Sequence, residues 1–255
     1  HFGVGNFHRS HQAVYADSLL DQGHMDWGIV GVSMRSSETR DRLAPQDFIY
    51  TLVTLSDSES ISKKNFKLIG SILNILVAPE NPTRVIKQLA DSQIKLVTIT
   101  ITEKGYCLTS GKINTRHPDI LADLSSLEAP KTVYGYIAAA AIQRRDQGGL
   151  PLSVLCCDNI QQGGEQLEDG VRMLIQQHDK TGVAWIKNNL SFASSMVDRV
   201  APASNETLKN IVSSALQMED AWPVAAEPFS QWVIQNKFAG TRPAFGQVGA
   251  VFTDD

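Results

Sequence analysis

Two glycines separated by one residue, Gly3 and Gly5, stand near the start of the chain, directly before a run of helical sequence. The first glycine allows the tight turn that joins a strand to a helix, and the second removes the Cβ that would hold a pyrophosphate away from the backbone. The following helix would offer its unpaired N–H groups and positive dipole end to a phosphate. His8 stands where the third glycine of this fingerprint belongs, so the pattern alone leaves an ordinary strand-to-helix turn equally open.

The residues after this turn favour a dinucleotide-binding unit. The helix is predicted to reach Leu20, and residues 27–34 form an apolar run of strand length. Strand, turn, helix and strand within about thirty residues make the unit that a Rossmann fold needs. At the end of the second strand a carboxylate would bind the 2′-hydroxyl of NAD, whereas an arginine would accept the 2′-phosphate of NADP. Arg35 and Ser36 come first and Glu38 follows, so the residues leave NAD and NADP open.

Alternating strands and helices predict the rest of the sheet. Apolar runs at 94–101 and 152–157 indicate buried parallel strands, and the second of them is apolar enough to be central. Residues 50–55 and 66–73 are predicted to pair as an antiparallel hairpin. The fold class is therefore α/β: a Rossmann-type, doubly wound, mostly parallel sheet with additional antiparallel strands. Further helices are predicted at 82–90, 133–145, 165–177, 208–216 and 229–236, and further strands at 192–200, 221–228 and 249–255.

The chain begins at the turn itself, where a first strand of about five or six apolar residues would be expected to come before it. We therefore interpret residues 1–255 as a dinucleotide-binding domain that is truncated at its start.

Three polar clusters follow predicted strands: Thr102-Glu103-Lys104, Asp158-Asn159 and Asp198-Arg199. In open α/β sheets, ligands bind at the carboxyl ends of the strands, so these clusters are candidates for a binding site. Each also has a structural interpretation. The first would be solvated loop charges, the second would cap a helix, and the third would be a surface ion pair.

Composition excludes several other classes. The net charge is −4 and no extended basic cluster occurs, so nucleic acid is not an expected partner. No apolar run approaches the length that crosses a bilayer. The three cysteines form no C-x-x-C or other metal-ligand pattern, so we expect no metal and a reducing, cytoplasmic location.

Several short strings are spread along the whole chain: HFGVGNFHRSH at 1–11, APQD at 44–47, TEKGY at 102–106, CDN at 157–159, SMVDRV at 195–200 and AEPF at 226–229. Together they resemble the long-chain mannitol dehydrogenase family, which includes mannitol 2-dehydrogenase and fructuronate reductase (mannonate oxidoreductase). The resemblance implies a zinc-independent, NAD(P)-dependent oxidoreductase that acts on a secondary alcohol or ketone of a linear polyol or hexuronate. It also implies a mostly helical catalytic C-terminal domain, absent from these residues, as a partner, so the domain would be truncated at its end too.

The resemblance assigns residue roles by position. Asn159 matches an asparagine that bonds the reacting oxygen, and Asp198 matches an aspartate beside nicotinamide and substrate. Cofactor contacts are expected from Gly3, Gly5, Asn6, Phe7, Arg35, Ser36 and Glu103.

The family's general base is a lysine in a K-x-R-x-x-N-x-x-H segment, which these residues do not contain. We therefore expect cofactor binding without useful turnover. Arg35-Ser36 and the APQD string favour the fructuronate reductase branch. Another sugar dehydrogenase, or a non-catalytic Rossmann-like sensor, remains as the alternative.

Overall fold

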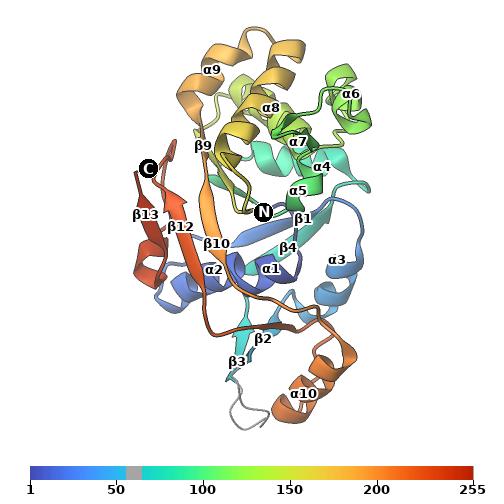
Figure 1. The fold of residues 1–255 in the computed structure, drawn as a ribbon, viewed down its shortest axis with the longest axis vertical. Coiled ribbons are helices and arrows are strands. Elements are labelled where there is room, and N and C mark those ends of the chain that lie inside the picture. The colour runs from blue at the N-terminus through green and yellow to red at the C-terminus, as the bar shows by residue number, and fades with distance from the viewer. Residues whose placement is uncertain (56–64, 255) are drawn as a thin grey trace.

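The computed structural model describes residues 1–55 and 65–254 (Figure 1). Its centre is a parallel sheet built from β1 (Ile29–Ser33), β4 (Ile72–Val77), β5 (Leu96–Ile99), β8 (Leu152–Cys156) and β9 (Leu190–Ala193). Phe2 forms parallel bridges to Val32 of β1 and to Ile99 of β5, and so stands as a first strand between them. The spatial order is β4-β1-Phe2-β5-β8-β9, which is the order of a doubly wound Rossmann sheet. The predicted fold class is confirmed.

Helices cover both faces of this sheet. On one face, α4 (Pro82–Ala90), α7 (Val133–Asp146) and α8 (Gly163–His178) pack together over an apolar core shared with β5 and β8. The N-cap of α7 is Thr132, whose hydroxyl accepts a hydrogen bond from the amide of Gly135 at 3.1 Å. On the other face, Tyr15 and Leu19 of α2 (Gln12–Asp21) pack with Trp232. Every residue of β8 is buried, as predicted for a central strand.

The predicted antiparallel pair is present, but its second strand is shorter than expected. β2 (Tyr50–Thr54) pairs antiparallel with β3 (Asn65–Ile69), and the loop predicted to join them lies almost wholly outside the described residues. The predicted strand 66–73 is interrupted at Gly70-Ser71, where the Gly70 amide donates to Asp17 and the Ser71 hydroxyl donates to the Ala13 carbonyl. These bonds to α2 turn the chain, so that Ile72 starts β4 in the central sheet.

Residues 229–236 were predicted to be a helix, and this was wrong. They contain β12 (Gln231–Gln235), which pairs antiparallel with β10 (Ser195–Asp198) and parallel with β13 (Val251–Thr253). Trp232 and Ile234 alternate inward with almost no exposure, which is the period of a strand. The Trp232 ring packs edge-on against Tyr15 with ring centroids 5.2 Å apart, so burial on one face decides the structure.

The predicted strand 192–200 is two strands in different sheets. β9 ends at Ala193, and β10 begins at Ser195. Between them the Ser194 hydroxyl accepts a hydrogen bond from the Gly164 amide at 2.9 Å, which fixes the point where the chain leaves the central sheet. The first helix is likewise interrupted. It is divided at His11 into α1 (Asn6–Ser10) and α2, and the His11 ring bonds the Gln231 carbonyl at 2.9 Å.

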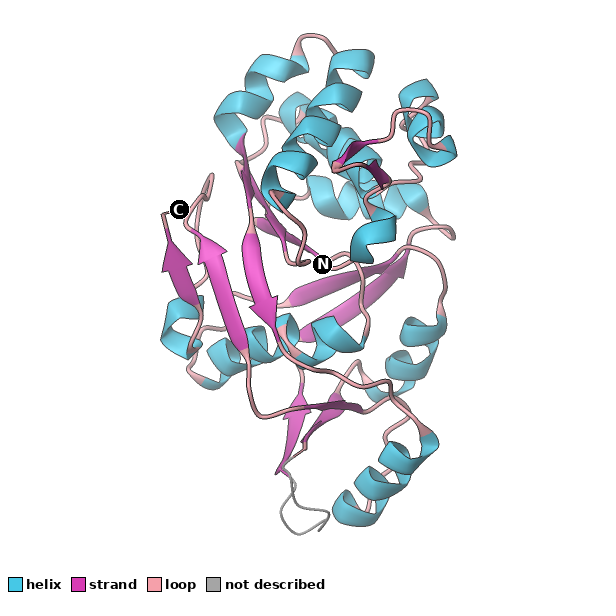
Figure 2. Ribbon diagram, in the orientation of Figure 1, coloured by secondary structure: helices cyan, strands magenta, loops and turns pink. Residues whose placement is uncertain are grey.

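The remaining elements lie around this core (Figure 2). Most helices gather on one side of the molecule, while β2, β3 and α10 lie at the opposite side. The predicted helix 208–216 and strand 221–228 are present as α10 (Glu206–Leu216) and β11 (Val224–Ala226), and β11 pairs with β2. Within the described residues, no helix is both long and apolar enough to cross a bilayer. The shorter elements are α3 (Glu38–Leu43), α5 (Thr102–Gly105), β6 (Leu108–Thr109), β7 (Lys112–Ile113), α6 (Pro118–Ser125), α9 (Gly182–Asn189) and the 3₁₀ turns Ala44–Gln46 and Phe245–Val248.

Candidate functional site

The two glycines of the first turn have different structural settings. Gly3 has φ +96°, and a Cβ built on it would lie 1.9 Å from the carbonyl oxygen of Thr100 in the neighbouring segment. Only glycine fits there. Gly5 has φ −86° and ψ −174°, which any residue adopts, and a Cβ on it would meet no atom within 4 Å. The space beside Gly5 is therefore open, as a turn that receives a ligand requires.

This turn lies at the switch point of the sheet. The Phe2 carbonyl accepts from the Thr100 amide at 2.8 Å, and the Gly3 amide donates to the Val32 carbonyl at 3.0 Å. The chain thus leaves the sheet between β1 and β5, the two strands from which the connections run in opposite directions. In doubly wound sheets the crevice at this point, outside the carboxyl ends of the strands, is where ligands bind.

Asn6 and Phe7 follow directly on α1. The Asn6 amide nitrogen donates to the Pro202 carbonyl at 3.2 Å, and its oxygen accepts from Arg9 at 2.7 Å. The Phe7 ring is half-buried and stacks on the His11 ring with centroids 5.0 Å apart. His8, at the position of the missing third glycine, is buried and stacks on His1 at 3.4 Å. Burial holds the pKa of His8 well below its usual range, so the ring is neutral and contributes no charge to a phosphate site.

The acid that the sequence suggested after β1, Glu38, is already paired: its carboxylate accepts from Arg42 at 2.9 Å. The next acid along the chain, Asp41, accepts from Arg40 at 2.7 Å. Arg35 and Ser36 are exposed directly after β1. Within the described part of the chain, no hydrogen bond or ion pair holds the Arg35 guanidinium.

Asp158, at the end of β8, organises the loop after β5. Its Oδ2 accepts from the amide of Ile101 and from the hydroxyl of Tyr106, each at 2.8 Å. Burial raises the pKa of Asp158, and these hydrogen bonds oppose the rise. The predicted cofactor residue Glu103 is exposed on α5, within the loop that Asp158 holds. Neither Asp158 nor Asn159 caps α8, so the structural interpretation given to this pair was wrong.

The two predicted catalytic residues are brought together by one backbone unit. The Asn159 side chain donates to the Val197 carbonyl at 2.9 Å and accepts from the Val197 amide at 3.3 Å. Asp198 is the next residue along β10 and is exposed. Arg199 does not pair with Asp198 in the described residues; it donates to the carbonyls of Glu227 and Ser10 instead. The side-chain amide of Asn159 thus fixes β10 against the end of β8, one residue before Asp198.

Two hollows lie at opposite ends of the central sheet. An open cleft of about 330 Å³ lies at the carboxyl ends of the strands, and Glu103, Asp158 and Asn159 are among its lining residues. A more enclosed hollow of about 120 Å³ is lined by the starts of β1 and β5, at their amino ends. The cleft at the carboxyl ends contains residues of two of the three polar clusters, those after β5 and β8, and is therefore the candidate for the site.

Comparison with known proteins agrees with this geometry. The family model described as the mannitol dehydrogenase Rossmann domain matches residues 1–247. This chain belongs to the mannitol dehydrogenase family. The ternary complex of Pseudomonas fluorescens mannitol 2-dehydrogenase with NAD and D-mannitol superposes with a TM-score of 0.93 at 40% identity, over 100% of this chain and 52% of that one. A substrate-free D-sorbitol dehydrogenase superposes with a TM-score of 0.91 at 33% identity, over 100% of this chain and 53% of that one.

Curated relatives of this mannitol dehydrogenase family member give the same picture. Mannitol 2-dehydrogenase of Pyrenophora tritici-repentis is 38% identical over 100% of this chain and 45% of its own length. The polyol:NADP oxidoreductase of Gluconobacter oxydans is 35% identical over 100% of this chain and 53% of its own length. The chain therefore spans about half the length of the relatives that it matches.

Proposed function

We propose that residues 1–255 form the cofactor-binding domain of an NAD(P)-dependent oxidoreductase, which transfers a hydride between a nicotinamide ring and a secondary alcohol or ketone of a linear polyol. A mostly helical catalytic domain, outside this sequence, would complete the active site. Support comes from the match to a dehydrogenase Rossmann domain and from the half-length coverage of the relatives.

One observation carries the cofactor proposal: Gly3 is required by the fold, whereas Gly5 borders empty space at the switch point. A turn with no ligand needs the first glycine but has no use for the second. Gly5, Asn6 and Phe7 would contact the pyrophosphate and nicotinamide side. Arg35 and Ser36 would lie at the adenosine ribose, and Glu103 would border the nicotinamide. NAD is the proposed cofactor, with NADP as the alternative that the exposed Arg35 favours.

Hydride transfer sets the roles of the two residues at the β8–β10 junction. When hydride leaves the carbinol carbon, its hydroxyl proton must go to a base, and the oxygen that becomes a carbonyl needs hydrogen-bond donors. Asn159 would be one donor. Its side-chain NH₂ group already donates to the Val197 carbonyl, so it would have to bond both oxygens or break that bond. Asp198 would lie beside the nicotinamide and the substrate. No lysine of this sequence stands in the family's base segment, so these residues alone would bind cofactor and fail to turn over.

The substrate class is open between a polyol and a hexuronate. The relatives carry the names of mannitol, sorbitol and polyol enzymes, which favours a polyol. A hexuronate of the fructuronate type is the second candidate, on the basis of Arg35-Ser36 and the APQD string. The alternative function, a non-catalytic nucleotide sensor, would use the same glycine turn to bind its nucleotide.

A fluorescence titration of the chain with NADH, and separately with NADPH, tests the proposal. Saturable binding of either reduced cofactor, with no oxidation of NADH in the presence of fructose, is the expected result. Turnover at the rate of a full-length relative would contradict the assignment of the base to another domain. No binding of either cofactor would contradict the proposed function of this chain.

A further inference from the structure

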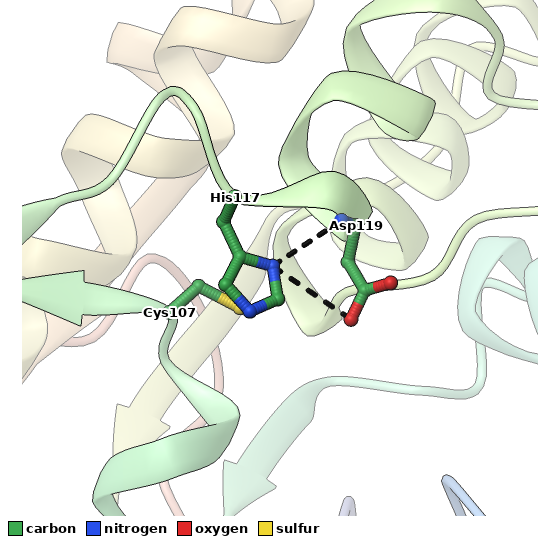
Figure 3. A group of neighbouring side chains, drawn as sticks. All are labelled: Cys107, His117 and Asp119. Atoms are coloured by element: carbon green, nitrogen blue, oxygen red, sulfur yellow. Dashed lines mark hydrogen bonds and ion pairs between the residues drawn. The ribbon is translucent and has the colours of Figure 1, made fainter.

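A cysteine, a histidine and an aspartate meet outside the cofactor cleft. Cys107 follows α5, and His117 and Asp119 stand at the start of α6 (Figure 3). One ligand atom from each, the Cys107 sulfur, a ring nitrogen of His117 and a carboxylate oxygen of Asp119, lies within 4.8 Å of the other two. His117 and Asp119 belong to the first turn of α6, and Cys107 lies between α5 and β6, so the fold of the intervening segment brings the thiol to the other two side chains.

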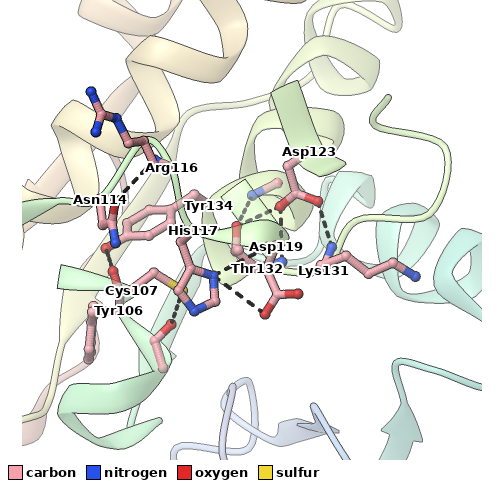
Figure 4. A network of polar contacts seen from close by, with 12 residues as sticks. Tyr106, Cys107, Asn114, Arg116, His117, Asp119, Asp123, Lys131, Thr132 and Tyr134 are labelled. Atoms are coloured by element: carbon pink, nitrogen blue, oxygen red, sulfur yellow. Dashed lines mark hydrogen bonds and ion pairs between the residues drawn. The ribbon is translucent and has the colours of Figure 1, made fainter. Parts of the chain in front are cut away.

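Backbone hydrogen bonds hold this arrangement in place (Figure 4). The Asn114 amide donates to the Cys107 carbonyl, and the His117 amide donates to the Asn114 carbonyl, each at 2.9 Å. These two bonds fold the segment after the β6–β7 hairpin back over Cys107. Cys107 itself has φ +51°, a left-handed conformation that is uncommon for a residue with a side chain and that recurs at functional positions.

The two carboxylates near this cluster, Asp123 and Asp119, differ in how far their oxygens are already occupied by hydrogen bonds. Asp123 is fully buried and accepts from the amides of Lys131 and Thr132 and from the Thr132 hydroxyl. Asp119 is exposed, and its Oδ2 lies 3.8 Å from His117 Nδ1. That separation is close to the ligand-to-ligand distance around a small tetrahedral cation, whose bonds are about 2.0–2.3 Å.

We propose that Cys107, His117 and Asp119 form a binding site for a divalent transition-metal ion of the zinc type, with water as the fourth ligand. Thiolate, imidazole and carboxylate together match zinc in ligand type and number, whereas magnesium and calcium prefer an all-oxygen set. The ion would have a structural role, because it would join the segment between α5 and β6, which contains Cys107, to the start of α6. This proposal does not depend on the proposed function.

When the metal binds, the protein loses the Cys107 thiol proton and one hydrogen bond to His117, and it gains metal–ligand bonds. Burial raises the pKa of the Cys107 thiol, so the thiol is protonated in the free protein and its proton must pass to solvent when sulfur coordinates. His117 Nδ1 accepts from the Asp119 amide at 3.2 Å and so serves as the N-cap of α6. Coordination through Nδ1 removes that cap, and the metal takes its place at the start of the helix.

Cobalt(II) titration of the metal-stripped, reduced protein tests the site, because a cobalt–thiolate bond gives a near-ultraviolet charge-transfer band and tetrahedral cobalt gives intense visible bands. The expected result is saturation at one cobalt per chain, with both sets of bands removed by added zinc. Absence of the charge-transfer band in the wild-type protein overturns the proposal.

Two variants and one control separate the metal site from a loss of fold. Cys107→Ala should remove the charge-transfer band, and His117→Asn, which keeps an oxygen to cap α6, should weaken cobalt binding at least about tenfold. Cys157→Ala, at a buried thiol outside the cluster, should keep the band. Circular dichroism confirms that each variant is folded. An unchanged band in folded Cys107→Ala, or loss of the band only in Cys157→Ala, overturns the assignment. NADH binding, measured in parallel, reports on the proposed function separately.

Discussion

The glycine turn at Gly3–Gly5 and the junction of β8 with β10 border the same edge of the sheet but are built in opposite ways. In the turn, both positions depend on the lack of a side chain. Gly3 is required because the Thr100 carbonyl approaches it closely, and Gly5 leaves an open space beside the backbone. At the junction, polar side chains are tied to the backbone. Asp158 holds the loop after β5, and Asn159 holds Val197. One region provides room for a ligand, and the other sets the positions of the groups around it.

This difference means that the two regions should respond differently to substitution. A side chain added in the turn acts by the space that it occupies. At Gly3 it would disturb the fold, and at Gly5 it would hinder a bound ligand. Removal of a side chain at the junction leaves backbone groups without partners, at a cost comparable to a lost hydrogen bond each.

The largest effect is expected for Gly3→Ala. The new Cβ would clash with the Thr100 carbonyl and would occupy a left-handed conformation. Overpacking and backbone strain together should lower the free energy of unfolding by about 2–4 kcal/mol. Chemical denaturation measures this loss. A Gly3→Ala protein as stable as the wild type would show that the first glycine is not structural, and the contrast between the two glycines would fail.

Asp158→Ala should come next. It leaves the Ile101 amide without its acceptor, while the Tyr106 hydroxyl keeps only the Cys156 sulfur, 3.4 Å away, so the free energy of unfolding should fall by about 1–3 kcal/mol. Asp158→Asn keeps one acceptor oxygen and should lose less. If the alanine and asparagine variants were equally stable, the hydrogen bonds of Asp158 would not be what holds the loop after β5.

The wild-type protein and Asp158→Asn also give a test of the pH dependence of stability. The folded state raises the pKa of Asp158, mainly through burial, so the folded protein binds this proton more tightly than the unfolded chain does. Stability from this group therefore rises as the pH falls from above the raised pKa toward the ordinary aspartate pKa, and it is constant below that. Subtracting the unfolding profile of Asp158→Asn from that of the wild type should isolate this slope. A difference that runs the other way would contradict the direction of the shift.

The smallest effect on stability is expected for Arg35→Ala. Arg35, just after β1, neither lies at a close approach as Gly3 does nor bonds the backbone as Asp158 does. Arg35 is exposed, and within the described residues nothing holds its guanidinium, so the substitution should leave the free energy of unfolding unchanged within about 0.5 kcal/mol. If Arg35 accepts a 2′-phosphate, the affinity for NADPH should fall several-fold and that for NADH should not. Equal losses for both cofactors would place Arg35 elsewhere than at the ribose.

Much of the fold could be predicted because local pattern and burial agree. The apolar run of β8 and the cap of α7 at Thr132 are local signals that the tertiary structure retains. The errors arise where long-range bonds override the local pattern. Residues 229–236 are an exception, because their aromatic and β-branched residues already favour a strand, and the packing of Trp232 against Tyr15 agrees with that local signal. The division of 192–200 depends on the Gly164 amide, 30 residues away in sequence, which no local pattern reveals.

The candidate site divides in the same way. Gly3 and Gly5 are visible in the sequence because backbone geometry restricts their identity. The position of Asn159 against Val197 and the role of Asp158 in holding Ile101 are visible only in the folded chain. The meeting of Cys107 with His117 and Asp119 follows no recognised ligand spacing, so a metal site at these residues could not be predicted before the fold was known. The roles of Asn159, Asp198 and the cofactor residues stay predictions.

The most direct test of the account is NADH binding by Gly5→Val. The backbone at Gly5 is extended and its surroundings are open, so valine should leave the fold and its stability unchanged. We expect the added side chain to occupy the space of the pyrophosphate and to raise the Kd for NADH at least about tenfold, which is about 1.4 kcal/mol. Wild-type affinity in a folded Gly5→Val protein would contradict the claim that this turn receives the cofactor.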